Sequence, residues 1–261
     1  MRLLFWRRPR IPVLVLHGVL ASRMGTLNLA GYATLIDRAC SRAARTGHLV
    51  LDINSPGGSP VQSDLIAARI RAQAAEHRVR VHAVIGDVGA SGGYWLACAG
   101  DEILANAMSI VGSIGVIGGG FGFEDTISRL GIHRRLYTAG ENKARLDPFT
   151  PERPQDVAFV HALMGDIHER FKTWVRTRRA GKLKADEATL FDGGYMLGAR
   201  ALEAGLIDRF GDVDALVREL AGKRARAETI RPRRRGLLAR LPRLTAEALL
   251  DAAEARMWPR L

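Results

Sequence analysis

A serine flanked by glycines has the residue type and the sequence setting of a catalytic group. The segment Gly89-Ala-Ser91-Gly-Gly93 follows an apolar run that ends at Ile85, and it precedes a segment with good helix-forming composition that starts at Tyr94. This order predicts a strand, a tight turn and a helix. A serine in such a turn presents its hydroxyl beside the first N–H groups of the helix, which can hold a developing oxyanion. Ser91 is therefore a candidate nucleophile, although the same pattern also fits a purely structural turn.

A second glycine turn, Pro56-Gly-Gly58, also follows an apolar strand-like segment. Strands are expected over residues 11–16, 48–53 and 79–85, and helices over residues 28–44 and 61–76. Three strand-helix repeats in succession favour the parallel sheet of an α/β fold. Ligands bind such sheets at the carboxyl ends of the strands, where both glycine turns would lie. Further expected elements are a strand over residues 110–117, a helix over 124–130, a strand over 134–137, a polar loop over 139–148 and a helix over 154–180.

A serine nucleophile needs a base, and the histidines offer only a weak candidate. The pattern Gly-x-Ser-x-Gly formally matches the nucleophile elbow of α/β hydrolases, which requires an acid and then a histidine downstream. Asp147 followed by His161 or His168 satisfies that order only trivially. His48 and His82 fall in expected strands, where a structural role is more common.

A lysine can replace histidine as the base when burial favours its neutral amine. Lys143 is a candidate because it lies in a Gly-Glu-Asn-Lys loop of an arginine-rich, lysine-poor domain. Sequence context alone fits an ordinary surface lysine equally well.

The composition suits one large α/β domain with basic appendages. The chain has 261 residues, of which 47% are hydrophobic and 25% charged, with a net charge of +12. Residues 1–10 hold +4 and residues 221–261 hold +7, so the residues between them are nearly neutral and no nucleic-acid partner is expected. Arginines interleaved with Leu, Phe and Trp at both ends suggest contact with an anionic membrane surface, a solvated tail being the alternative.

Cysteines and apolar runs indicate where such a chain would reside. Cys40 and Cys98 lie in apolar, alanine-rich segments and are expected to be core thiols rather than a disulfide. No stretch is long and apolar enough to span a bilayer, and the N-terminus lacks the core of a signal peptide. We therefore expect a cytoplasmic location, with peripheral attachment at the inner membrane face as a hypothesis. No ligand spacing such as His-Glu-x-x-His occurs, so neither a metal nor a cofactor is expected.

Five motifs in a fixed order carry a family resemblance. They are Asn54-Ser-Pro-Gly-Gly58, Gly89-Ala-Ser-Gly-Gly-Tyr94, Ile110-Val-Gly-Ser-Ile-Gly-Val116, Gly140-Glu-Asn-Lys143, and Asp208 within Ala204-Gly-Leu-Ile-Asp-Arg-Phe-Gly211. Over about residues 11–220 this set resembles the signal peptide peptidase A family, the protease IV and SohB-like Ser-Lys peptidases. The resemblance implies a crotonase-like or Clp-like α/β fold of stacked βα units, of the ββα superhelix type. It also implies three parts: a basic N-terminal segment (1–10), a Ser-Lys peptidase domain (11–220) and a basic amphipathic C-terminal tail (221–261).

The resemblance also implies roles for individual residues. Ser91 would be the nucleophile, Lys143 the general base, and Ser113 the residue that orients the lysine amine. The N–H groups of Gly58 and Gly92 would form the oxyanion hole. The residues by themselves point to Ser91 and to both glycine turns, whereas Lys143 and Ser113 rest on the family.

The implied activity is that of a serine endopeptidase acting on signal peptides, or on other short or unfolded hydrophobic peptides, near the membrane. The single-repeat length implies a homo-oligomer, and typical members carry a membrane-spanning N-terminal segment that this sequence lacks. Two other classes remain open. One is a non-proteolytic relative, either a crotonase-like acyl-CoA enzyme or a pseudo-peptidase scaffold, which would not need both Ser91 and Lys143. The other is a membrane-surface adaptor whose function resides in residues 221–261.

Overall fold

The computed structural model describes residues 9–232, which divide into two units. The first unit comprises residues 9–115 and 168–232, and the second comprises residues 116–167. The strands are β1 Arg10–His17, β2 His48–Ser55, β3 Arg80–Ala90, β4 Glu102–Ala105, β5 Ile110–Gly112, β6 Tyr195–Leu197, β7 Arg209–Phe210 and β8 Arg226–Ile230. The helices are α1 Leu29–Ala43, α2 Pro60–Glu76, α3 Gly92–Ala97, α4 Glu124–Arg129, α5 Pro154–Arg178, α6 Glu187–Leu190, α7 Gly198–Glu203 and α8 Val213–Ala221.

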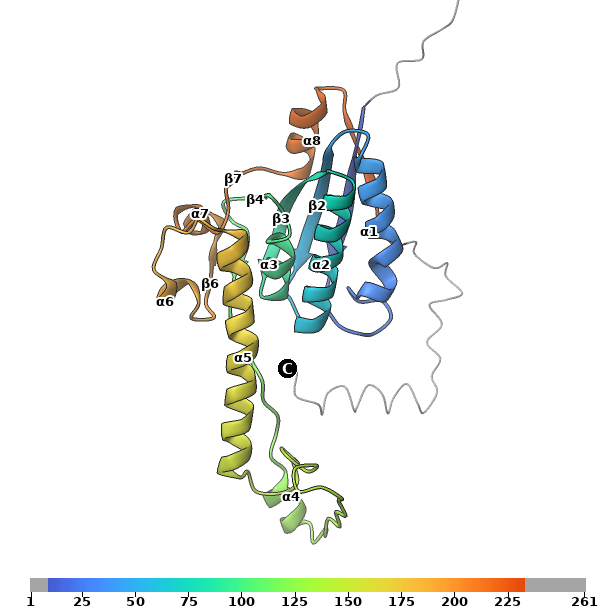
Figure 1. The fold of residues 1–261 in the computed structure, drawn as a ribbon. Helices are drawn as coiled ribbons and strands as arrows, with labels where there is room; N and C mark the ends of the chain where they lie inside the picture. The colour runs from blue at the N-terminus through green and yellow to red at the C-terminus, as the bar shows by residue number, and fades with distance from the viewer. Residues whose placement is uncertain (1–8, 233–261) are drawn as a thin grey trace, which may run out of the picture. The chain divides into compact units, whose positions relative to one another are not determined.

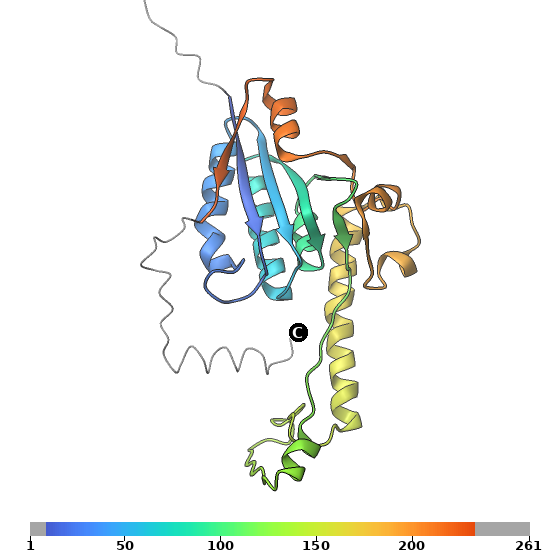
Figure 2. The ribbon, with the colours of Figure 1, turned by 180° about the vertical axis from the view of Figure 1, so that it is seen from behind.

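The first unit is a mostly parallel sheet with helices on both faces, which confirms the expected α/β class. The main strand order is β6-β5-β3-β2-β1-β8, and β5 with β6 is the antiparallel pair. Helices α1, α2 and α3 cover one face (Figure 1), where the larger apolar core forms. Helix α8 packs against the other face (Figure 2) over a smaller core that includes Val13, Val50 and Leu216. Strands β1 and β2 carry apolar residues toward both faces, as buried parallel strands do.

Strand β3 positions the site because it pairs with two strands along one edge. Its first half, His82 to Ile85, pairs with β4, and its last residues, Val88 to Ala90, pair with β5. The strand continues to Ala90, beyond the end at Ile85 that the apolar run predicts. It therefore delivers Ser91 to the carboxyl edge of the sheet, beside the end of β5.

A buried ion pair holds the loop after α5 to the sheet and explains the motif around Asp208. Arg179 is 2% exposed, donates from Nη1 to Asp208 Oδ2 at 2.7 Å, and donates from Nε and Nη2 to the Gly205 carbonyl. The same carboxylate accepts the Ile103 N–H at 2.7 Å, which ties the motif to β4. The Tyr94 hydroxyl donates to the Leu206 carbonyl at 2.7 Å and ties the motif to α3. Asp208 is thus a structural anchor of the helix that follows Ser91.

A buried histidine lies between a second histidine and a carboxylate on the α8 side of the sheet. His82 is 3% exposed, with Nε2 at 3.1 Å from His48 Nδ1 and Nδ1 at 2.9 Å from Glu102 Oε2. Burial lowers the pKa of His82, and the hydrogen bond with Glu102 only partly opposes this. His48 and His82 are therefore structural, as their strand positions indicate. Both cysteines are buried and free, and burial raises the pKa of Cys40 and Cys98 to about 12.

Three further sequence expectations differ from the structure. The strand expected over residues 110–117 ends at Gly112, because Ser113 takes a positive φ and leaves the sheet. Residues 134–137, expected as a strand, have no regular structure and are exposed; the short apolar-polar pattern lacks a neighbouring strand. Residues 226–230, which composition placed in the basic tail, form β8 and pair with β1, and Ile230 is buried in the main core. The ordered sheet therefore extends past the boundary expected at residue 220. The basic segment before Pro9 and the amphipathic stretch after Pro232 lie outside the described residues.

The second unit holds α4, the first part of α5 and a long loop between them. Phe123 packs on Phe149 with ring centroids 5.7 Å apart, and Arg134 lies over the Phe149 ring and donates to Asp147 at 2.8 Å. Asp156, at the start of α5, is buried and forms ion pairs with Arg145 and Arg153. Among the helices of residues 9–232, none is long and apolar enough to span a membrane.

Replacing Asp208 should test its role as a structural anchor. The substitution Asp208→Asn leaves the buried Arg179 guanidinium without its counter-charge, so we expect the free energy of unfolding to fall by about 3 kcal/mol. Urea denaturation measures this, with the exposed Asp64→Asn as a control that should change it by less than about 0.5 kcal/mol. The double variant Asp208→Asn/Arg179→Met should recover part of the loss. Equal stability of Asp208→Asn and Asp64→Asn would contradict the anchor.

The buried His82 predicts a loss of stability on mild acidification. Because its folded pKa is lowered, the unfolded chain takes up a proton below about pH 6.5 while the folded chain resists it, so stability falls as the pH decreases. The slope for one proton is at most about 1.4 kcal/mol per pH unit. Between pH 7.5 and 5.5, His82→Gln should lose less stability than the wild type, whereas the half-exposed His77→Gln should match the wild type. Parallel pH profiles for all three would refute this origin.

Candidate active site

Ser91 occupies a strained turn between β3 and α3. Its φ of 52° and ψ of −124° are unfavourable for a residue with a side chain, and such strain is frequent at functional sites. The backbone is held there because the Ser91 N–H donates to the Gly112 carbonyl at 2.8 Å and the Ser91 carbonyl accepts from Trp95 at 3.0 Å. The side chain is half-buried and makes no capping bond to α3. The turn therefore presents a hydroxyl that is not used in holding the helix.

The two glycine turns touch through their backbones. A Cβ placed on Gly57 would lie 2.7 Å from the Gly92 nitrogen and 2.8 Å from Ser91 Cβ, and Gly57 has a φ of 96°. A Cβ on Gly92 would meet the Ser63 hydroxyl and lie 2.9 Å from Leu20 Cδ1. Both positions thus require glycine. The consequence is that the turn after β2 packs directly on the turn that carries Ser91.

The Gly58 N–H takes no part in the backbone bridge to the Leu20 segment. Leu20 donates to the Gly57 carbonyl at 2.9 Å and accepts from the Ser59 N–H at 2.8 Å, so the bridge uses the residues on either side of Gly58. The Gly58 N–H has no acceptor within residues 9–232, and Gly58 is exposed. Gly92, as the first residue of α3, also has an N–H that no helix carbonyl accepts. Two backbone donors are therefore free beside Ser91, the arrangement that can hold an oxyanion.

Ser113 lies next to Ser91 at the same edge of the sheet. Strands β3 and β5 pair with Ala90 opposite Gly112, about 5 Å apart, and Ser91 and Ser113 are the next residues after this pair. Ser113 also has a φ of 52°, and its N–H donates to the Gly194 carbonyl at 2.6 Å. The first unit therefore brings together Ser91, Ser113, Gly58 and Gly92.

Lys143 belongs to the second unit. It lies in an irregular stretch, where its N–H donates to the Gly140 carbonyl at 3.3 Å, and it is exposed. Its action on Ser91 stays a prediction from the family resemblance. His168, one of the alternative bases, has Nε2 at 3.0 Å from the Ile114 carbonyl, which fits a structural role. Within residues 9–232, no group of three or more His, Cys, Asp or Glu side chains could hold a metal ion.

Asn54 is a site-forming residue to which sequence reasoning assigned no role. Between Ile53 and Ser55 the pairing with β3 shifts, because β3 contains extra residues around Asp87. The Asn54 side chain accepts the Val88 N–H at 3.1 Å and donates to Asp87 at 2.8 Å, which satisfies the backbone where the ladder is interrupted. Asn54 thereby fixes the last residues of β3 before Ser91. Its place at the start of the Asn-Ser-Pro-Gly-Gly motif was the available signal.

A family profile and several relatives named as proteases indicate one family for this chain. The sequence profile of peptidase family S49 matches residues 73–226. Protease 4 of Haemophilus influenzae is 31% identical over 65% of this chain and 27% of its own length, and a protein of Enterococcus faecium named for signal peptide peptidase SppA is 28% identical over 62% and 47%. A Brucella melitensis protein named Na(+)/H(+) antiporter NhaA is 46% identical over 88% of this chain. The chain spans 31% of that protein's length, so the antiporter name belongs to a much longer polypeptide.

Adding a methyl group at Gly57, where the two turns touch, should lower the reactivity of Ser91 without a matching loss of stability. Gly57→Ala forces the turn away from Ser91 and Gly92, and a displacement of about 1 Å costs roughly 100-fold in rate at a reacting centre. We expect a fluorophosphonate probe, which traps activated serines, to label Gly57→Ala about 100-fold more slowly than the wild type. Gly47→Ala is the matched control, because Gly47 has a φ of 76° but nothing within 4 Å of an added Cβ. Equal labelling rates in the two variants, at equal thermal stability, would contradict the packing argument.

Proposed function

The chain belongs to peptidase family S49, and on that premise we propose that it is a serine endopeptidase with Ser91 as nucleophile and Lys143 as general base. The observation that carries the proposal is the strained Ser91 turn with two free backbone N–H groups beside it. The neutral Lys143 amine takes the Ser91 proton while Oγ attacks a peptide carbonyl. The Gly58 and Gly92 N–H groups stabilise the tetrahedral oxyanion, worth roughly 3 kcal/mol for each donor.

The second half of the reaction uses the same groups. Lys143 returns the proton to the leaving amine, and water then hydrolyses the acyl-enzyme with Lys143 again as the base. Ser113, one residue beyond the β5 position that pairs with Ala90, is proposed to accept a hydrogen bond from the lysine amine and so orient it. Because Lys143 is exposed in the second unit, we propose that substrate or a neighbouring subunit removes water from its amine during the reaction.

The finer assignments follow the same family. We propose a crotonase-like or Clp-like variant of the α/β fold, which the parallel sheet with turns at its carboxyl edge supports. The substrates are proposed to be signal peptides or other short or unfolded hydrophobic peptides near a membrane surface. A homo-oligomer is supported by large apolar side chains of the second unit that are exposed, among them Ile117, Phe121 and Tyr137.

A peptidase assay with matched variants tests the mechanism. On an unfolded peptide rich in Leu and Ala, Ser91→Ala and Lys143→Ala should each lower kcat by about 10⁴-fold or more, and Ser113→Ala by less. The exposed Ser41→Ala and Lys184→Ala are controls and should keep wild-type rates.

The outcomes separate the competing classes. Full activity in Ser91→Ala or Lys143→Ala contradicts the Ser-Lys mechanism. Hydrolysis of an acyl-CoA that survives both substitutions would favour the crotonase-like alternative, and a folded wild type without either activity would favour a scaffold.

A further inference from the structure

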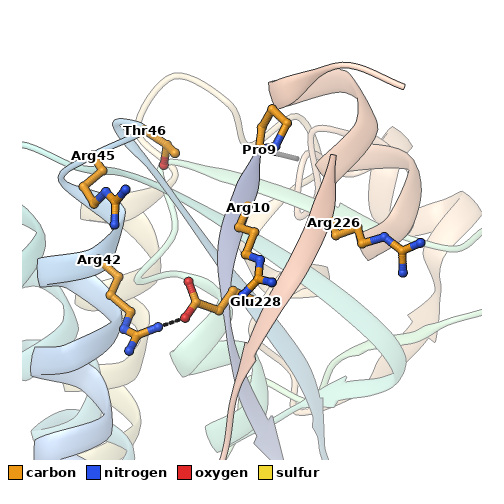
Figure 3. Close-up of a pocket in the computed structure, with 7 residues that line it drawn as sticks. All are labelled: Pro9, Arg10, Arg42, Arg45, Thr46, Arg226 and Glu228. Carbon is orange, nitrogen blue, oxygen red and sulfur yellow. Dashed lines mark ion pairs between the residues drawn. The ribbon is translucent and has the colours of Figure 1, made fainter. Parts of the chain in front are cut away.

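A pocket lined with arginine lies at the amino end of the sheet in the first unit (Figure 3). Its volume is about 930 Å³, within the range of small-ligand sites. The lining comes from the starts of β1 and β8 and from the end of α1 with the residues after it. The lining residues are Pro9, Arg10, Arg42, Arg45, Thr46, Arg226 and Glu228.

The pocket carries an excess of positive charge. Arg42 forms an ion pair with Glu228, the one carboxylate of the lining. Across residues 9–232, no carboxylate lies within ion-pair distance of Arg10, Arg45 or Arg226. The carbonyl end of α1 supplies only about half a negative charge. The partial charge at the end of α1 and the Glu228 carboxylate together therefore leave most of the positive charge of the four lining arginines uncompensated.

The sheet register adds to this charge instead of dispersing it. Strands β1 and β8 pair with Arg10 opposite Arg226, and like charges at directly opposed positions destabilise a sheet. Figure 3 shows Arg42 on α1 paired with Glu228 of β8, Arg45 on the turn after α1 and Arg10 on β1, while the Arg226 side chain extends to the other side of β8 in this view. A bound anion would relieve the repulsion among these side chains.

We propose that this pocket binds a phosphate-bearing anion, supplied either by the headgroup of an anionic phospholipid or by a free phosphorylated small molecule. Guanidinium groups match phosphate oxygens with paired N–H donors, which ammonium groups cannot do. In the sequence, Leu3, Leu4, Phe5, Trp6, Arg7 and Arg8 directly precede the pocket, which supports the lipid source.

The pocket is separate from the peptidase site. It lies where β1 and β8 begin, whereas Ser91 follows the end of β3. The eight residues of β1 rise about 3.3 Å each, so the two edges are roughly 25 Å apart. The ligand would therefore not compete with a peptide, and the proposal does not rest on peptidase activity.

Full-length variants in two binding assays test the pocket. Calorimetry measures pyrophosphate binding, and co-sedimentation compares phosphatidylglycerol-containing vesicles with phosphatidylcholine vesicles. The pocket variants are Arg45→Gln and Arg10→Gln. Their controls are Arg38→Gln, an exposed arginine on α1, and Arg80→Gln, the exposed first residue of β3. Every variant keeps both basic ends of the chain, so their contribution cancels in each comparison.

Each pocket substitution should weaken binding about tenfold relative to its control, the loss expected for one charge-assisted contact. Glu228→Gln should bind more tightly, because it removes the carboxylate and frees Arg42; a mere loss of folding could not produce that result. If pyrophosphate binding responds to the substitutions in this way, the ligand is a free phosphorylated molecule. If only the binding of phosphatidylglycerol vesicles responds in this way, the ligand is a lipid headgroup. If the control substitutions weaken binding as much as the pocket substitutions do in both assays, the proposal is overturned.

Discussion

The contact between the turn at Gly57 and the turn at Gly92 is the constraint on which the site depends. A Cβ on Gly57 would meet the Gly92 nitrogen, and a Cβ on Gly92 would meet the side chains of Ser63 and Leu20, so both turns are held in one arrangement beside Ser91. A positive φ at Ser91 costs of order 1–3 kcal/mol. The fully buried Tyr94 and Leu96 of the following helix offset that cost through core packing. The strained turn is stable because the helix behind it is part of the core.

Residues far from Ser91 in the sequence hold this contact in place. Asn54 satisfies the backbone where β3 departs from regular pairing, and the Leu20 bridge holds the residues on both sides of Gly58. Asp208 acts from the other side, because its loop accepts the Tyr94 hydroxyl and the buried Arg179. These groups are engaged in hydrogen bonds within the protein, so their role is to hold the Ser91 turn in place.

Local pattern predicted the part of the fold that repeats. Alternating strands and helices up to Ser91 gave the parallel sheet and placed both glycine turns at one edge, because those relations follow from chain order. Strand β8 could not be found in this way, since Arg226 to Ile230 has a tail-like composition and becomes a strand only by pairing with β1. Local pattern could not single out the proposed base, Lys143, either, because a lysine becomes a base only through its tertiary surroundings.

The two edges of the sheet illustrate two ways to stabilise negative charge. At the carboxyl edge the proposed donors are the neutral N–H groups of Gly58 and Gly92, and such donors interact weakly with an uncharged peptide and strongly with a charge that exists only in the transition state. At the amino edge the donors are guanidinium groups, Arg10 and Arg45 among them, whose permanent charge favours an anion that is already charged when it binds. A guanidinium beside Ser91 would bind the carboxylate product as well as the transition state. The separation of the two kinds of donor therefore keeps the carboxyl edge suited to turnover and the amino edge suited to retention.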